Sequence, residues 1–315
     1  MIVSTGIRTD IANHYAPWMF ERFREGYVLS RNPLFPTHIV RYRLTPDLVD
    51  AVLFCSKNYA PALSRLFEIT ERYHTFFHYT ITAFGRDLEP NVPDEADRIR
   101  TLKELCAQVG RERILWRFTP VFFSEEYPAA RLIDDFARLA EKIAPFVSGC
   151  VIGFLEPFFS MRTRLPGIVP PENEQKRAFA RAIVPIAQKY QLSLQTCKTH
   201  ATFEDLGIAS RGCYTLDAIG SANGCAFLPV RHTGNARGCL CVPARDIGWY
   251  DSCPNFCKYC NADRSFEEVQ KNMALHDVHS PLLIGSPQAG DEIVDGQQTS
   301  YLRDGRQISL FDTFS

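Results

Sequence analysis

The chain has 315 residues, of which 45% are hydrophobic and 23% are charged, and its formal net charge is −1. This composition is typical of a soluble globular protein with one large α/β domain, or with a domain and an appendage. Lys plus Arg (35) nearly equals Asp plus Glu (36), and no secretory segment or bilayer-length apolar run is present, so neither nucleic acid nor a membrane is expected as a partner and a cytoplasmic location is favoured.

Apolar strands and amphipathic helices alternate over the first 200 residues. The periodicity predicts strands at 2–5, 51–54, 76–82, 114–118, 150–155 and 192–196, and helices at 17–25, 61–73, 93–109, 130–143 and 172–190. Six such βα units with right-handed connections predict a parallel sheet in an α/β fold. No G-x-G-x-x-G follows the first strand, so a TIM-like (βα) barrel, closed or partial, is favoured over a dinucleotide-binding sheet.

Polar side chains stand just past the predicted strands. The carboxyl ends of the strands form the active-site face of α/β folds, so these residues predict a mouth that binds a small polar substrate. Arginine and lysine there suit a carboxylate or phosphate, whereas acidic residues suit amines or proton transfer. The candidate catalytic residues are Arg8, Asp10, Lys57, Arg117 and Glu156, and the strand-end candidates for cofactor binding are Asn58 and Thr82.

Regular periodicity is lost beyond residue 200, where Gly, Asn and Cys become frequent. Eight of the eleven cysteines lie between Cys197 and Cys260, which in a reducing compartment is better explained by metal than by disulfides. The other three, among them Cys55, are predicted to be small core residues. The chain is therefore predicted to have a barrel over 1–200, a cysteine-rich metal-binding lid over 201–275, and a polar tail over 276–315 that docks on the barrel.

The segment Cys253-Pro254-Asn255-Phe256-Cys257-Lys258-Tyr259-Cys260, here called the cysteine loop, has the spacing C-x3-C-x2-C. Such a loop can place three soft thiolates around one small inorganic centre, which favours an iron–sulfur cluster. Two alternatives remain. One is a structural zinc ion completed by Cys239 or Cys241, and the other is a set of unliganded or disulfide-bonded thiols.

The cysteine loop resembles the signature of radical S-adenosylmethionine (SAM) enzymes, including the aromatic Tyr259 just before the last cysteine. The resemblance implies a [4Fe–4S] cluster whose open iron binds SAM, with Tyr259 near the cofactor and a donor such as flavodoxin or ferredoxin supplying electrons. In ordinary members the motif follows the first strand, whereas here it follows the sixth βα unit. Their Gly-Gly-Glu site for the SAM amino group is not evident, and Glu156 is the candidate replacement.

Four further cysteines predict a second metal site, either another [4Fe–4S] cluster or a zinc ion. Cys197 ends the sixth predicted strand, Cys213 follows it, and Cys239 and Cys241 precede the cysteine loop. On an extended chain the last two side chains would point to opposite faces, so a turn that Gly238 permits is needed for both to bind one metal. The alternative is that one of this pair completes the first site while the other thiols are simply buried.

Landmarks along most of the chain are similar to a bacterial family known as domain of unknown function 1848. They include Arg8-Thr9-Asp10-Ile11, Lys57-Asn58, Trp116-Arg117 and Asp246-Ile247-Gly248 ahead of the cysteine loop. The resemblance implies a barrel with a C-terminal iron–sulfur motif and supplies no reaction. The chain departs from the family pattern at Asn255-Phe256, where His-Gly is more usual.

Two functions are compatible with these features. The leading hypothesis is a radical-SAM-type enzyme that acts on a small polar substrate at the barrel mouth. The alternative is a non-SAM iron–sulfur or zinc protein, for redox chemistry or ligand binding, in which the metal is structural.

Overall fold

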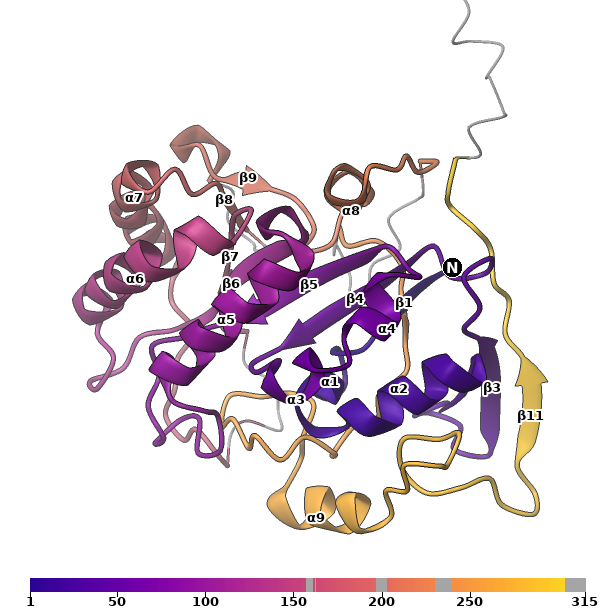
Figure 1. Ribbon diagram of the computed structural model, residues 1–315. Helices are drawn as coiled ribbons and strands as arrows, with labels where there is room; N and C mark the ends of the chain where they lie inside the picture. The colour runs from indigo at the N-terminus through magenta and orange to yellow at the C-terminus, as the bar shows by residue number, and fades with distance from the viewer. Residues whose placement is uncertain (157–160, 162, 197–202, 230–239, 304–315) are drawn as a thin grey trace, which may run out of the picture.

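The computed structural model of the protein describes residues 1–156, 161, 163–196, 203–229 and 240–303. Its largest element is an eight-stranded sheet in which every neighbouring pair is parallel, with the order β10-β1-β4-β5-β6-β7-β8-β9 (Figure 1). The strands are β1 (Ile2–Ser4), β4 (Ala51–Ser56), β5 (Thr75–Thr80), β6 (Ile114–Val121), β7 (Cys150–Phe154), β8 (Leu194–Thr196), β9 (Ala209–Ser210) and β10 (Arg245–Asp246).

The six strands predicted from the sequence are all present in this sheet, so the parallel α/β fold is confirmed. From β1 to β9 each strand lies beside its predecessor in the sheet, and β10 returns to the free edge of β1. The two edge strands are therefore β9 and β10. Within the described residues no ladder joins them.

Helices follow the strands, and α5, α6 and α7 lie together over one face of the sheet (Figure 1). Their ends follow local signals, since Gly26 and Gly110 adopt positive φ angles just past α2 and α5. The helices are α1 (Ile11–His14), α2 (Ala16–Glu25), α3 (Ala60–Leu63), α4 (Phe67–Thr70), α5 (Glu95–Val109), α6 (Ala129–Ile143), α7 (Asn173–Lys189), α8 (Leu216–Asn223) and α9 (Phe266–Ala274), with 3₁₀ turns at Arg111–Arg113, Ala144–Phe146 and Glu204–Leu206.

One predicted helix, over 61–73, is wrong in its continuity. The structure divides it into α3 and α4. Between them the amides of Arg65 and Leu66 bond to carbonyls three residues back rather than four. This tighter turn interrupts the α-helical ladder, which apolar spacing alone does not reveal.

Alternate residues of each strand face two different apolar layers, as the period of two requires. The larger layer includes Phe54, Phe77 and Trp116 and packs under the helices. The opposite face of the sheet carries the intervening residues, such as Leu53 and Phe76. These pack against residues 213–214 and 241–242, so the segment predicted as a lid packs on this opposite face of the sheet and supplies β9 and β10.

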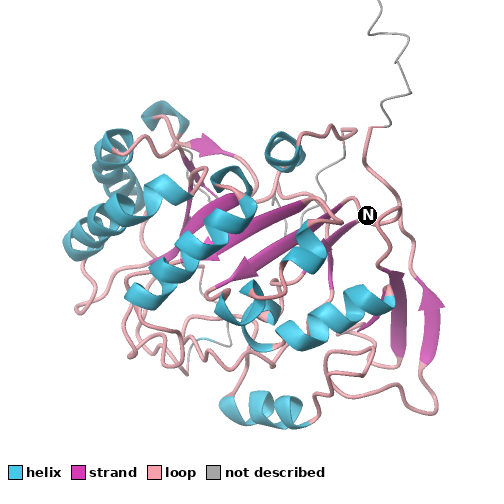
Figure 2. Cartoon of the chain, in the orientation of Figure 1, coloured by secondary structure: helices cyan, strands magenta, loops and turns pink. Residues whose placement is uncertain are grey.

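A second, three-stranded sheet was not predicted. It has the order β11-β3-β2 and is formed by β2 (Tyr27–Arg31), β3 (His38–Arg43) and β11 (Glu292–Asp295) (Figure 2). Strand β11 comes from the predicted tail and pairs in parallel with β3. Further along the tail, the backbone amide of Tyr301 donates to Asp50 at 2.8 Å. In the part of the chain that the structure describes, no helix combines the length and apolarity needed to cross a membrane.

Candidate functional site

The cysteine loop lies at the carboxyl ends of β1, β4 and β5. There a cavity of about 150 Å³ is lined by Cys253, Cys257 and Cys260 together with residues that directly follow those strands. Asp10 and Lys57 are among them, as the strand-end argument predicts. The chain reaches this point because Ile247, just past β10, donates its amide to Ser4 of β1 at 3.1 Å.

Hydrogen bonds from several elements fix the backbone of the loop. The Lys258 amide donates to the Leu88 carbonyl at 2.9 Å, and Asn91 donates to the Pro254 carbonyl at 2.8 Å. Arg164 donates to the carbonyls of Cys257 and Cys260. These hydrogen bonds hold the backbone of the cysteine loop in its observed conformation.

Phe256 has a φ of 51°, a left-handed conformation that favours glycine. The more usual Gly of the family pattern would adopt this angle without strain. In this chain the Phe256 ring packs on Phe266, with ring centroids 4.5 Å apart. That contact offsets part of the conformational cost.

Asp10 joins three segments of the cavity wall. Its carboxylate accepts hydrogen bonds from the amide of Asn13 at 3.2 Å, from the amide of Lys57 at 2.9 Å and from the side chain of Asn255 at 3.3 Å. Burial raises the pKa of Asp10, although nearby His14 and the donated bonds act in the opposite direction. The residue thus positions the cysteine loop against the ends of β1 and β4.

Lys57 crosses the cavity wall to a buried carboxylate that the sequence analysis missed. Its Nζ lies 2.8 Å from Glu89 Oε1, which also accepts from Thr82 Oγ1 at 2.5 Å and from the hydroxyl of Tyr259. The pKa of Glu89 is lowered: burial raises it, but Lys57, Arg98 and the donated hydrogen bonds outweigh that effect. Glu89 sits in the irregular segment between β5 and α5, where no sequence pattern distinguishes it.

Cys253 and Cys257 are buried and Cys260 is partly buried, and burial is the largest cause of the raised pKa values of their thiols. The pKa of Cys253 is well above the ordinary value, that of Cys257 is also raised, and that of Cys260 rises to about 11. Bound cationic iron or zinc would stabilise the thiolate forms that this environment otherwise disfavours. Among the described residues, no group of three or more His, Cys, Asp or Glu side chains is arranged so that it could hold a metal ion. A cluster needs wider spacing than one ion does, because each thiolate binds a different iron.

Cys55 also lines this cavity, so the prediction that it is simply a core residue is incomplete. Its position near the end of β4, on the same face of the sheet as Leu53, brings a fourth sulfur to the wall. Arg117 of β6 lies behind it and donates from Nη1 to Cys55 Sγ at 3.1 Å. Arg117 is therefore beneath the cavity, where it contacts the site through Cys55.

The remaining strand-end candidates are not brought together with the loop cysteines. Among the described residues lining the cavity there is neither Arg8 nor Glu156 nor Asn58. Arg8 lies 3.9 Å from Asp246 and donates to the Gly248 carbonyl, and Glu156 is exposed after β7. Asn58 donates to Asn13 at 2.8 Å and accepts from the Ala60 amide, which makes it a turn residue.

Of the four cysteines predicted to form a second site, two are close together. Cys213 and Cys241 are buried against the face of the sheet that carries Leu53 and Phe76, and the Cys213 amide donates to Cys241 Sγ at 3.1 Å. Cys197 and Cys239 lie outside the described residues. The second site therefore stays a prediction.

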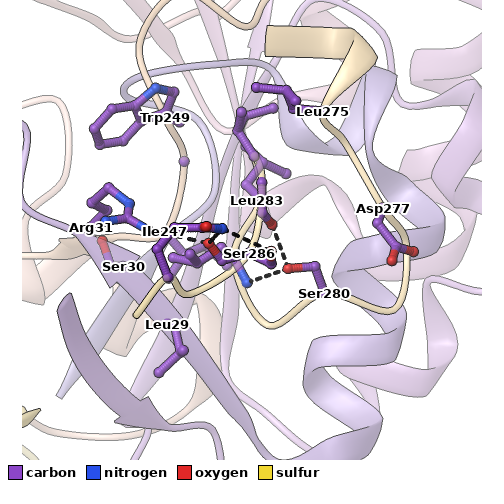
Figure 3. Close-up of a pocket in the computed structure, with 15 residues that line it drawn as sticks. Leu29, Ser30, Arg31, Ile247, Trp249, Leu275, Asp277, Ser280, Leu283 and Ser286 are labelled. Atoms are coloured by element: carbon purple, nitrogen blue, oxygen red, sulfur yellow. Dashed lines mark hydrogen bonds between the residues drawn. The ribbon is translucent and has the colours of Figure 1, made fainter. Parts of the chain in front are cut away.

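A larger cavity, of about 440 Å³, lies elsewhere, between β2 and the segments 247–249 and 275–288 (Figure 3). Trp249, Leu275 and Leu283 line it from the C-terminal segments, and Arg31 lines it from β2. Arg31 is already bound to Asp291 by two hydrogen bonds of 2.7 and 2.8 Å. No residue predicted for the site lies among its described lining residues.

Comparison with known proteins identifies the family to which the chain belongs. No curated protein matches the chain. The model of the family described as domain of unknown function (DUF1848) matches residues 2–262, so this protein belongs to that family.

Proposed function

We propose that the protein is an iron–sulfur enzyme of radical-SAM type, with a [4Fe–4S] cluster bound by Cys253, Cys257 and Cys260. One observation carries the proposal. All three thiols line a single cavity at the carboxyl ends of parallel strands, which is the active-site face of α/β folds. The same proposal includes a partly closed (βα) barrel, a cytoplasmic location and a small-protein electron donor such as flavodoxin or ferredoxin.

The tertiary position of the loop supports the proposal, although the motif comes late in the chain. In ordinary radical SAM enzymes the motif follows the first strand, but here it is more than 240 residues further along the chain. Strand β10 pairs in parallel with β1, and the cysteine loop follows β10, so the motif lies at the carboxyl end of the first strand although it comes late in the chain. The spatial arrangement thus supports the same chemistry despite the different chain order.

When bound, the cluster would supply one electron to SAM and cleave it to a carbon radical. The protein's own groups would bind and orient the small molecules. Lys57 carries a positive charge at the cavity wall, which suits a carboxylate, and Asp10 offers carboxylate oxygens to an amine or hydroxyl. Tyr259 and Thr82 act indirectly, since both donate to the Glu89 carboxylate that holds Lys57.

A specific observation also favours a second candidate, a closed cluster in a redox or structural role. Cys55 is a fourth sulfur on the same cavity wall, and a cluster with four thiolate ligands has no open iron for SAM. The two candidates differ in what Cys55→Ala does. With an open iron, the variant keeps its cluster and its response to SAM. With Cys55 as a ligand, it loses iron or gains an open site.

The test is anaerobic reconstitution followed by electron paramagnetic resonance of the reduced cluster, with and without SAM. The proposal expects about four irons per cluster and a changed spectrum on addition of SAM. An unchanged spectrum in the wild-type protein, with a changed one in Cys55→Ala, supports the closed cluster. Zinc without iron after reconstitution refutes both forms of the iron–sulfur proposal and leaves a structural zinc site.

A further inference from the structure

A third cavity, of about 230 Å³, is lined in part by Glu89, which also contacts Tyr259 of the cysteine loop. It opens between the segment that follows β5 and the first turn of α5, and Thr82, Glu89 and Arg98 line it. Thr80, two residues before Thr82, instead lines the cavity at the cysteine loop, here called the cluster cavity. The Lys57–Glu89 pair therefore stands between the two cavities.

Two buried, oppositely charged side chains face this cavity with unused hydrogen-bonding atoms. Arg98 is 3% exposed and donates from Nη2 to the Thr82 carbonyl at 3.3 Å, but its Nε and Nη1 find no hydrogen-bond partner among the described residues. Glu89 is 2% exposed, and its Oε2 likewise has no partner in the described chain. Buried polar atoms are almost always hydrogen-bonded, so this ion pair leaves hydrogen-bonding capacity that a water molecule or a polar ligand atom can satisfy.

The charge balance restricts what that group can be. The other charged lining residues are already paired: Arg86 with Asp94 at 2.9 Å, and Glu95 with Arg138 and Lys142. An anion near Arg98 would meet the Glu89 carboxylate, and a cation near Glu89 would meet the Arg98 guanidinium. A neutral group that both accepts and donates avoids both repulsions.

The distance between the unused atoms fits such a group. Arg98 Nη1 lies 3.8 Å from Glu89 Oε2, too far for a direct hydrogen bond. A single hydroxyl oxygen to one side of the line that joins them, about 2.8 Å from each atom, can accept from the guanidinium and donate to the carboxylate. Phe84, Val92 and Pro93 complete the lining with apolar surface that suits a carbon skeleton.

We infer that this cavity is a hydroxyl-binding subsite for a polyol- or sugar-type small molecule. Its assignment to the substrate rests on the proposed function, because only then does the adjoining cavity hold the reacting centre. The binding itself does not depend on that function. A ligand bound in this subsite would also affect the cluster cavity, because the other carboxylate oxygen of Glu89 accepts a hydrogen bond from Lys57 Nζ.

The experiment measures binding to the reconstituted protein by saturation-transfer-difference nuclear magnetic resonance. Glycerol and ribose serve as hydroxyl probes, and glycine and inorganic phosphate as charged probes. Two variants remove the subsite in different ways. Glu89→Gln replaces the accepting Oε2 with a donor, and Ala83→Leu fills the cavity, which Ala83 lines, without changing a polar group. Glu104→Gln, exposed on α5, is the matched control.

The expected result is that ribose or glycerol binds the wild-type protein and Glu104→Gln equally. Both site variants should weaken that binding at least about tenfold, Glu89→Gln because a hydrogen bond to a charged group is lost and Ala83→Leu because the larger side chain fills the cavity. Circular dichroism establishes whether each variant is folded. If Glu89→Gln is not folded, the binding measured with Ala83→Leu decides the test. The inference is overturned if neither ribose nor glycerol binds, or if phosphate or glycine binds more tightly than both of them. Hydroxyl binding without a spectral response to SAM would instead overturn only the proposed function.

Discussion

Glu89→Gln is the most informative single change, because this carboxylate connects the cysteine loop with Lys57. The substitution keeps the side-chain shape but removes a charge that lies 2.8 Å from Lys57 Nζ and 3.8 Å from Arg98 Nη1. Removing one partner of a buried ion pair costs about 3–5 kcal/mol. Gln retains one oxygen for Thr82 and Tyr259, so we expect about 3 kcal/mol. At ~2 °C per kcal/mol for a chain of this size, the melting temperature falls by about 6 °C.

The pH dependence isolates the charge from the shape. The pKa of Glu89 is lowered below its ordinary value of 4.5, mainly because Lys57 and Arg98 outweigh the opposing effect of burial. A lowered folded-state pKa means that the charge stabilises the fold fully above pH 4.5. This stabilisation is then lost as the pH falls through the folded-state value. The stability gap between wild type and Glu89→Gln should therefore be constant near neutral pH and narrow below pH 4.5.

Urea denaturation followed by circular dichroism, repeated across this pH range, measures that gap. Glu104→Gln should stay within about 0.5 kcal/mol of wild type throughout, because the side chain is exposed. A gap that is absent at neutral pH, or that widens as the pH falls, would refute the reasoning. Either result would mean that Glu89 is not an ionised partner of Lys57 in the folded protein.

Three further outcomes follow from the described contacts. Replacing all three cysteines of the cysteine loop with Ala should abolish iron binding at this site after anaerobic reconstitution; an iron content equal to that of the wild-type protein would contradict the ligand assignment. Lys57→Ala should weaken SAM binding in calorimetry about tenfold, whereas Arg8→Ala should not, because only Lys57 lines the cavity. Trp116→Ala should cost about 3–5 kcal/mol in chemical denaturation, since the side chain is fully buried and stacks on Phe136; a cost below about 1 kcal/mol would show that this layer is not tightly packed.

Local patterns in the chain determined the six main strands and most of the helices. Period-two and period-3.6 spacing of apolar residues, with glycines such as Gly26 and Gly110 at helix ends, depends only on neighbours along the chain. The spacing of the cysteine loop is local as well. Asp10 and Lys57 each follow a predicted strand, and because the carboxyl ends of parallel strands share one face, the sequence predicts that they lie close together. The structure places both at the same cavity.

Only the tertiary structure decided which strand-end residues face that cavity. Arg8 turns to Asp246 and Arg117 turns to Cys55, in each case because a partner far along the chain is close in space. Glu89 and Cys55 gain their positions in the same way. The three-stranded sheet was equally hidden, since Glu292 pairs with His38 across some 250 residues. Strand pairing and side-chain partners are set by long-range packing, and the periodicity of a short segment carries no information about which distant segment will cover it.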